Sequence, residues 1–226
     1  MLLDLKKINQ VPLGYNEYIR EKHDKVQIVL HHTAGNSSGV NTINAWNNDK
    51  RGRIATCVCI SGKGKSRNSY DGEIVQAFSS RYWAYHLGLK RDVFRSFGLP
   101  YKSIDKISIG VEICNWGSLT KIGDKFYNYV NREVPLDEVC ILNSPYKCKK
   151  YYHKYTDAQI ESTRQLLVYW NKVYGIPLDY IDENMWDLSK DALSGKPGVY
   201  THNSYRKDKS DISPQPNMIK MLSSLK

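Results

Sequence analysis

The residues best suited to metal or acid–base chemistry are histidines, of which the sequence has six. Four of them lie at strand ends or in loops flanked by glycine and aromatic residues, where α/β proteins tend to build their sites: His31, His32, His86 and His202. His31 directly follows the apolar run 26–30, and His202 directly follows the apolar segment 198–201. The placement after two buried segments makes both imidazoles candidates for a site at one edge of a sheet.

A carboxylate close to the second histidine extends this candidate site. Asp211 lies nine residues after His202. Two imidazoles and one carboxylate are a common ligand set of catalytic zinc, and they leave a fourth position for water. Zinc would then act as a Lewis acid and generate hydroxide near neutral pH. Because 171 residues separate His31 from His202, spacing alone does not decide between this site and ordinary structural histidines.

The elements that must position these residues alternate between strands and helices. Short, β-branched or alternating runs predict five strands, at 26–30, 54–60, 73–78, 107–114 and 198–201. Capping signals predict three helices, at 41–48 after the cap 36–39, at 156–174 with a capping box and a stop at Gly175, and at 217–225. A Gly/Lys/Ser-rich loop is expected at 61–68. The pattern is typical of a single α/β domain, residues 1–226, with a central mixed β-sheet flanked by helices.

The alternation of the strand 107–114 places a second carboxylate. Ile107, Ile109, Val111 and Ile113 share one face, and Ser108, Gly110, Glu112 and Cys114 share the other. Glu112 therefore lies on the face opposite the isoleucines, where a salt-bridged strand residue is the plain expectation.

Composition limits the classes of protein and partner. The formal net charge of +10 favours an anionic partner, or serves solubility alone. No apolar stretch approaches the roughly 20 residues of a membrane span, and the first residues lack the apolar core of a signal peptide. The five cysteines, odd in number and irregularly spaced, favour synthesis in a reducing cytoplasm. Within 54–60, Cys57 and Cys59 are predicted to be a buried reduced pair rather than a metal site.

Four motifs occur in one order along the chain. They are Ile28-Val-Leu-His-His-Thr-Ala-Gly35, Tyr82-Trp-Ala-Tyr-His-Leu-Gly88, Ser108-Ile-Gly-Val-Glu112, and Thr201-His-Asn203 with Lys209-Ser-Asp211. Together they resemble the zinc-dependent N-acetylmuramoyl-L-alanine amidases, the family that includes peptidoglycan recognition proteins and phage amidase endolysins. The resemblance covers about residues 26–220.

The resemblance implies a role for each matching residue. His31, His202 and Asp211 would be the zinc ligands, with Asp211 in a position where some members carry cysteine. Glu112 would be the general base or water-positioning residue, and Lys209 would stabilise the oxyanion. His86 and Trp83 would contact substrate, and His32 would either join them or pack beside the metal site.

Two departures from the family pattern affect this transfer of roles. Around Thr56 and Cys57 the family often carries tyrosine or histidine, so a catalytic tyrosine hydroxyl at that strand has no equivalent here. The Tyr- and Lys-rich segment 117–155, with short alternating pieces at 125–130 and 138–142, has no counterpart in the smallest members. It is either a substrate-binding lobe with aromatic faces for sugars or a surface elaboration.

The function implied is hydrolysis of the amide between N-acetylmuramic acid and L-alanine, with peptidoglycan or a muropeptide as the partner. The protein would be a monomer, acting on the bacterial cell wall like a phage lysin or on cytoplasmic muropeptides. A non-catalytic peptidoglycan-binding module is the alternative, although all three ligand residues are present. Nucleic-acid binding is not expected, because no helix-turn-helix, RNA-recognition or zinc-finger pattern occurs.

Overall fold

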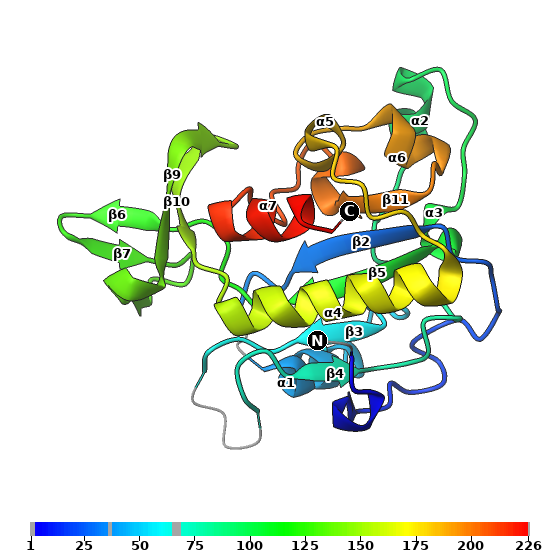
Figure 1. Cartoon of the computed structure of the whole chain (residues 1–226), viewed down its shortest axis with the longest axis horizontal. Coiled ribbons are helices and arrows are strands. Elements are labelled where there is room, and N and C mark those ends of the chain that lie inside the picture. The colour runs from blue at the N-terminus through cyan, green and yellow to red at the C-terminus, as the bar shows by residue number, and fades with distance from the viewer. Residues whose placement is uncertain (1–2, 36–37, 65–68, 226) are drawn as a thin grey trace.

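A central mixed sheet organises the computed structural model, which describes residues 3–35, 38–64 and 69–225 (Figure 1). Its strand order is β1-β4-β3-β5-β2-β11. The bounds are β1 Asn9–Gln10, β2 Gln27–His32, β3 Val58–Ile60, β4 Ile74–Gln76, β5 Ser108–Ile113 and β11 Gly198–Thr201. Neighbouring strands are parallel except β3 and β4, which are antiparallel. The expected single α/β domain with a central mixed sheet is confirmed.

Helices cover the sheet on both faces, and for this reason β2 is buried along its whole length. The long helix α4 (Asp157–Tyr174) crosses one face, with α7 (Pro216–Ser223) beside it (Figure 1). Helix α1 (Gly39–Trp46) packs against β3 and β4. The shorter helices are η1 Leu5–Lys7, α2 Arg91–Ser96, α3 Ile104–Ile107, α5 Asp182–Met185, α6 Lys190–Ser194 and η3 His202–Ser204.

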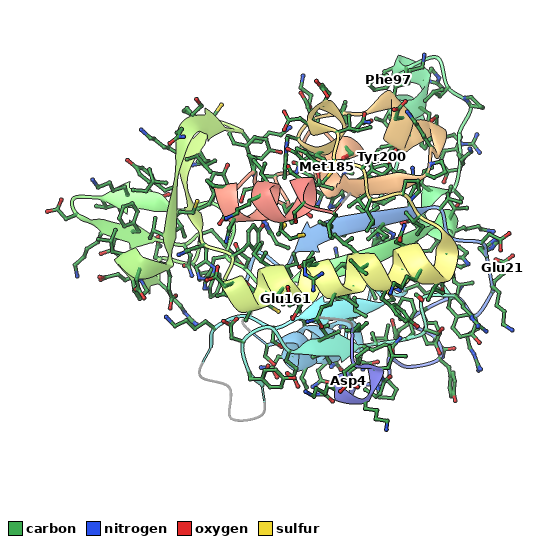
Figure 2. The ribbon with its side chains drawn as sticks, in the orientation of Figure 1. Asp4, Glu21, Phe97, Glu161, Met185 and Tyr200 are labelled. Carbon is green, nitrogen blue, oxygen red and sulfur yellow. The ribbon has the colours of Figure 1, made fainter. Side chains whose placement is uncertain are left out.

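Two apolar cores result from this layering. The larger one joins β-strand residues such as Ile109 and Val111 to the buried stripe of α4, including Leu167 and Trp170. A smaller core lies around β11, α2 and α6; it contains buried Tyr200, and half-buried Phe97 packs against this cluster (Figure 2). The functional residues of β2 and β5 are thus held on strands that are fixed from both sides.

Segment 117–155 forms a lobe at the carboxyl end of β2 and β5 (Figure 1). Strands β6 (Thr120–Ile122), β7 (Lys125–Tyr127) and β8 (Glu133–Val134) make one small sheet. After η2 (Leu136–Glu138), β9 (Val139–Tyr146) and β10 (Lys149–His153) form a hairpin. The lobe has a small apolar core of its own, which contains Leu119, Phe126 and Val134.

Local signals predicted both ends of α4 well. Thr156 forms the predicted capping box of α4, and Gly175 ends that helix in the left-handed region at φ 69°. Ser38 caps α1, while Asn36 and Ser37 of the predicted cap lie outside the described residues. Residues 65–68 of the predicted loop also lie outside them.

Most strands start or end one or more residues away from the prediction, and two of these differences bear on the site. The strand predicted at 54–60 is regular only from Val58, because Ile54 makes an isolated bridge to Tyr85 and the Thr56 hydroxyl donates to the Val58 carbonyl. The strand predicted to end at residue 30 continues to His32. The two histidines are paired in register with Glu112 and Ile113 of β5, so they belong to the sheet and not to a loop.

Candidate metal centre and active site

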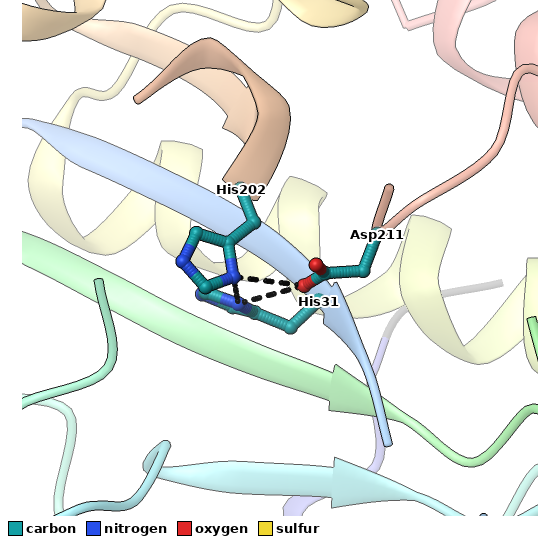
Figure 3. Close-up of side chains that lie close together, drawn as sticks. All are labelled: His31, His202 and Asp211. Atoms are coloured by element: carbon teal, nitrogen blue, oxygen red, sulfur yellow. Dashed lines mark hydrogen bonds and ion pairs between the residues drawn. The ribbon is translucent and has the colours of Figure 1, made fainter. Parts of the chain in front are cut away.

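Two histidines and one aspartate from distant parts of the chain meet beside β2, with α4 behind the strands (Figure 3). His31 lies near the end of β2, and His202 begins η3 directly after β11. Because β11 and β2 are parallel neighbours with Thr201 opposite Leu30, strand pairing brings the two histidines together. Asp211 reaches the same point from the loop between η3 and α7.

The three ligand atoms form a small triangle. His31 Nδ1 lies 3.1 Å from His202 Nδ1 and 3.3 Å from Asp211 Oδ2, and His202 Nδ1 lies 2.9 Å from the same oxygen. Ligand atoms bound tetrahedrally at about 2.0–2.1 Å from zinc lie about 3.3 Å from one another. The spacing and the donor set of two imidazoles and a carboxylate therefore fit a zinc ion with a fourth position left for water.

The ionisation of these groups also suits a cation. Burial, with the charge of His202 as the next cause, lowers the pKa of His31 to about 4, so this imidazole is neutral at physiological pH. Burial acts to raise the pKa of Asp211, but the adjacent His202 and His31 rings outweigh it and hold that pKa well below its usual range. Neutral imidazole and ionised carboxylate are the forms that bind a metal.

Glu112 and Lys209 lie next to this triangle. Glu112 of β5 is opposite His31 in strand register, and its side chain keeps some exposed surface. Burial, and then the negative charge of Asp211, raise the pKa of Glu112 well above its usual value, whereas Lys209 lowers it. A carboxylate with a raised pKa beside a metal centre is suited to moving protons near neutral pH.

The resemblance assigns substrate contact to three residues, His86, His32 and Trp83. The His86 side chain is 5% exposed, and its two ring nitrogens lie 2.9 Å from His31 Nε2 and 2.9 Å from Ser108 Oγ. His32 is buried, with Nδ1 at 3.1 Å from the Tyr155 hydroxyl. His31 and His202, the candidate metal ligands, are buried as well, and substrate contact by His32 or His86 stays a prediction.

Trp83, the third of them, is also buried. Its ring packs edge-on against His23 and Tyr85, under the Lys106 ammonium. Cys57 and Cys59 are buried and form no disulfide, as predicted. Within the described residues, the single cluster of histidine, cysteine and acidic side chains spaced for a metal is His31, His202 and Asp211.

A comparison with known protein families identifies the family of this chain. Residues 22–216 match the family model described as N-acetylmuramoyl-L-alanine amidase. The chain belongs to this amidase family. The resemblance noted from the four motifs is thereby confirmed, and so is the expectation that the protein is an enzyme of this activity.

Solved structures agree on the fold of the amidase. PlyL superposes with a TM-score of 0.53 at 14% identity, covering 97% of this chain and 98% of PlyL. LysC, an N-acetylmuramoyl-L-alanine amidase from Clostridium intestinale URNW, gives 0.52 at 15% identity, with 97% and 99% covered. The endolysin amidase LysCS from the same organism also gives 0.52 at 15%, with 99% of each chain covered. No curated protein matches by sequence. Among the described residues of the amidase, no helix is long and apolar enough to span a bilayer.

Sequence reasoning assigned no role to several residues that contact the histidines in and around the candidate metal centre. Ser108, Leu87 and Asp105 contact His86 or His202, and Tyr155 contacts His32. Ser108 could have been found, because alternation puts it on the same strand face as Glu112. The Leu87 contact is made by a backbone carbonyl, which side-chain types do not reveal.

Proposed function

We propose that this amidase is zinc-dependent and cleaves the bond between the lactyl group of N-acetylmuramic acid and L-alanine in peptidoglycan. His31, His202 and Asp211 would hold the metal. The observation that carries the proposal is the convergence of two imidazole nitrogens and a carboxylate oxygen within 3.3 Å of one another in a chain of this family.

Zinc, when bound, would polarise the scissile carbonyl and lower the pKa of water. Glu112 accepts a proton from the attacking water while the water oxygen forms a bond to the carbonyl carbon of the substrate. As the carbon–nitrogen bond breaks, Glu112 gives that proton to the nitrogen of L-alanine. The exposed part of its side chain, opposite His31 in the sheet, suits this transfer.

Lys209 supplies positive charge near the reacting group. The electrostatic influence of its ammonium on His31, His32 and Glu112 supports this role. The negative charge that develops on the carbonyl oxygen is stabilised by such a fixed cation. Around Thr56, where the family often carries tyrosine, this chain supplies no hydroxyl to the reaction. The Thr56 hydroxyl already donates a hydrogen bond to the Val58 carbonyl.

The lobe 117–155 would bind the glycan part of the substrate. Tyr129 is 66% exposed, and its ring meets that of Trp116 at 60° with 6.2 Å between centroids. Both rings lie over Gly35, where an added Cβ would be 3.7 Å from the Tyr129 hydroxyl and 3.9 Å from Trp116. Gly35 follows His31 by four residues, a reach of at most about 13 Å. Exposed aromatic faces this close to the site suit the apolar faces of sugar rings.

A direct experiment joins metal content to product. Purified protein should hold one zinc per chain and release L-alanyl peptides from sacculi or from soluble muropeptides. Turnover of intact sacculi supports a wall-lytic role, and turnover of soluble muropeptides alone supports a role in muropeptide recycling. Zinc at one equivalent without release of L-alanyl peptides from either substrate would contradict the proposal and favour a binding module.

A further inference from the structure

The consecutive residues His86 and Leu87 contact both histidines of the metal centre. His86 Nδ1 lies 2.9 Å from His31 Nε2, and the Leu87 carbonyl oxygen lies 3.0 Å from His202 Nε2. In each case the contacted nitrogen is the one that faces away from Asp211. The tautomer of a metal-binding histidine is set by the hydrogen bond that its other nitrogen makes.

We propose that the dipeptide His86–Leu87 fixes the tautomers of both histidine ligands, with His86 acting as a positioning residue for His31. The role in metal binding rests on the proposed zinc function. The tautomers themselves are argued from hydrogen-bond geometry.

The direction of the hydrogen bonds can be followed from a backbone carbonyl to His31. The Ser108 hydroxyl donates to the Ile104 carbonyl at 2.9 Å, so Ser108 Oγ is an acceptor toward His86 Nε2. His86 then carries its proton on Nε2 and presents a lone pair at Nδ1. That lone pair requires a proton on His31 Nε2, which leaves the lone pair of neutral His31 on Nδ1, toward His202 and Asp211.

His202 is set more directly. A carbonyl oxygen only accepts, so the contact with Leu87 requires a proton on His202 Nε2. The neutral ring then has its lone pair at Nδ1, 2.9 Å from the Asp211 oxygen. Both imidazoles therefore present lone pairs to a carboxylate, an arrangement that favours a cation among them.

The dipeptide is itself held in place. One Asp105 oxygen accepts the backbone N–H of His86 at 2.9 Å and that of Leu87 at 3.0 Å. Asp105 is buried at the start of the segment that leads into β5, the strand of Ser108 and Glu112. Ligand orientation is thereby tied to the strand that carries the proposed proton-transfer residue.

The test uses the metal-free full chain. Long-range proton–nitrogen NMR of the imidazoles should show His31, His86 and His202 each protonated at Nε2 and bare at Nδ1. Zinc affinity is then measured by competition with a chelator. His86→Leu should weaken zinc binding by about 10- to 100-fold, the usual effect of losing a partner of a ligand. His86→Asn keeps an acceptor near the Nδ1 position and should bind zinc nearly as well as the wild type.

Controls separate this role from a structural one. His153→Leu removes another buried histidine, which makes no hydrogen bond to the three ligand residues, and should leave zinc affinity unchanged. If His86→Leu does not fold, Ser108→Ala provides the test, and it should shift part of the His31 population to the Nδ1-protonated tautomer.

Two results would overturn the inference: a proton on His31 Nδ1 in the wild type, or unchanged zinc affinity in folded His86→Leu. A wild type that binds no zinc would defeat the proposed function, and the NMR tautomers would then decide this inference alone.

Discussion

Replacing Glu112 by glutamine separates proton transfer from metal binding. The amide has nearly the volume of the carboxylate, and Glu112 is outside the ligand triangle, so fold and zinc content should persist. Turnover of muropeptide should fall by about 100-fold or more, the usual effect of losing a general acid–base group. A 100-fold loss corresponds to ~2.7 kcal/mol of transition-state stabilisation.

The raised pKa of Glu112 gives this prediction a pH dependence. A base must be ionised, so wild-type activity should be present above the raised pKa and be lost as pH falls through it; the Gln variant should lack this limb. The stability of the folded protein changes with pH in the opposite direction to the activity. The folded state holds the proton more tightly, so wild-type stability should decline as pH rises from about 4.3, the unfolded value, through the folded pKa. The always neutral glutamine should remove that decline.

The assay combines release of L-alanyl peptide, zinc analysis and thermal unfolding of the metal-free protein across pH. Glu183→Gln is the matched control, because Glu183 is exposed on α5 and should change none of the three. A Glu112→Gln enzyme that holds zinc and turns over at the wild-type rate would show that Glu112 is structural.

Further predictions concern the metal, the lobe, the backbone and the charge. His202→Ala should lose most of its zinc by metal analysis; unchanged stoichiometry would remove His202 from the site. Tyr129→Ala should raise KM for glycan-containing substrate and leave turnover of the smallest muramoyl peptide unchanged, and an equal effect on both would argue against a glycan wall. Gly117→Ala should lower the free energy of unfolding by about 1–2 kcal/mol or more in denaturant titrations, because φ is 72° and the new Cβ would lie 2.7 Å from His32 Nε2. Gly123→Ala, at φ 58° with open space around it, should lower the free energy of unfolding by less. Equal losses in the two variants would show that the His32 side chain moves aside without cost. Co-sedimentation with sacculi should weaken from low to high salt, since the net charge is +10; equal retention would mean that short-range contacts carry the binding.

The sheet and its helices were predictable where local signals were strong. Alternation in 107–114 placed Ile109 and Val111 in the core, and the Thr156 capping box began α4 where predicted. Boundaries that depend on partners were less predictable. The apolar run predicts a strand that ends at residue 30, but pairing with β5 keeps His31 and His32 in the sheet.

The candidate site is also predictable from the sequence only in part. Motif order named His31, His202 and Asp211, and the structure brings them together. The contact between His86 and His31 of β2 is not visible in the sequence, because it depends on how the assembled sheet places the two rings.

The pairing of β11 with β2 also has a consequence for synthesis. His31 leaves the ribosome 171 residues before His202, which takes roughly 10–30 s at common elongation rates. Until then β2 lacks its neighbour on that side of the sheet, and the chain offers one imidazole where three ligand atoms are needed. A fragment that stops short of residue 202 could therefore bury much of the core and still hold no zinc in this site. Under the proposed function, hydrolytic competence would arrive only when β11 pairs with β2.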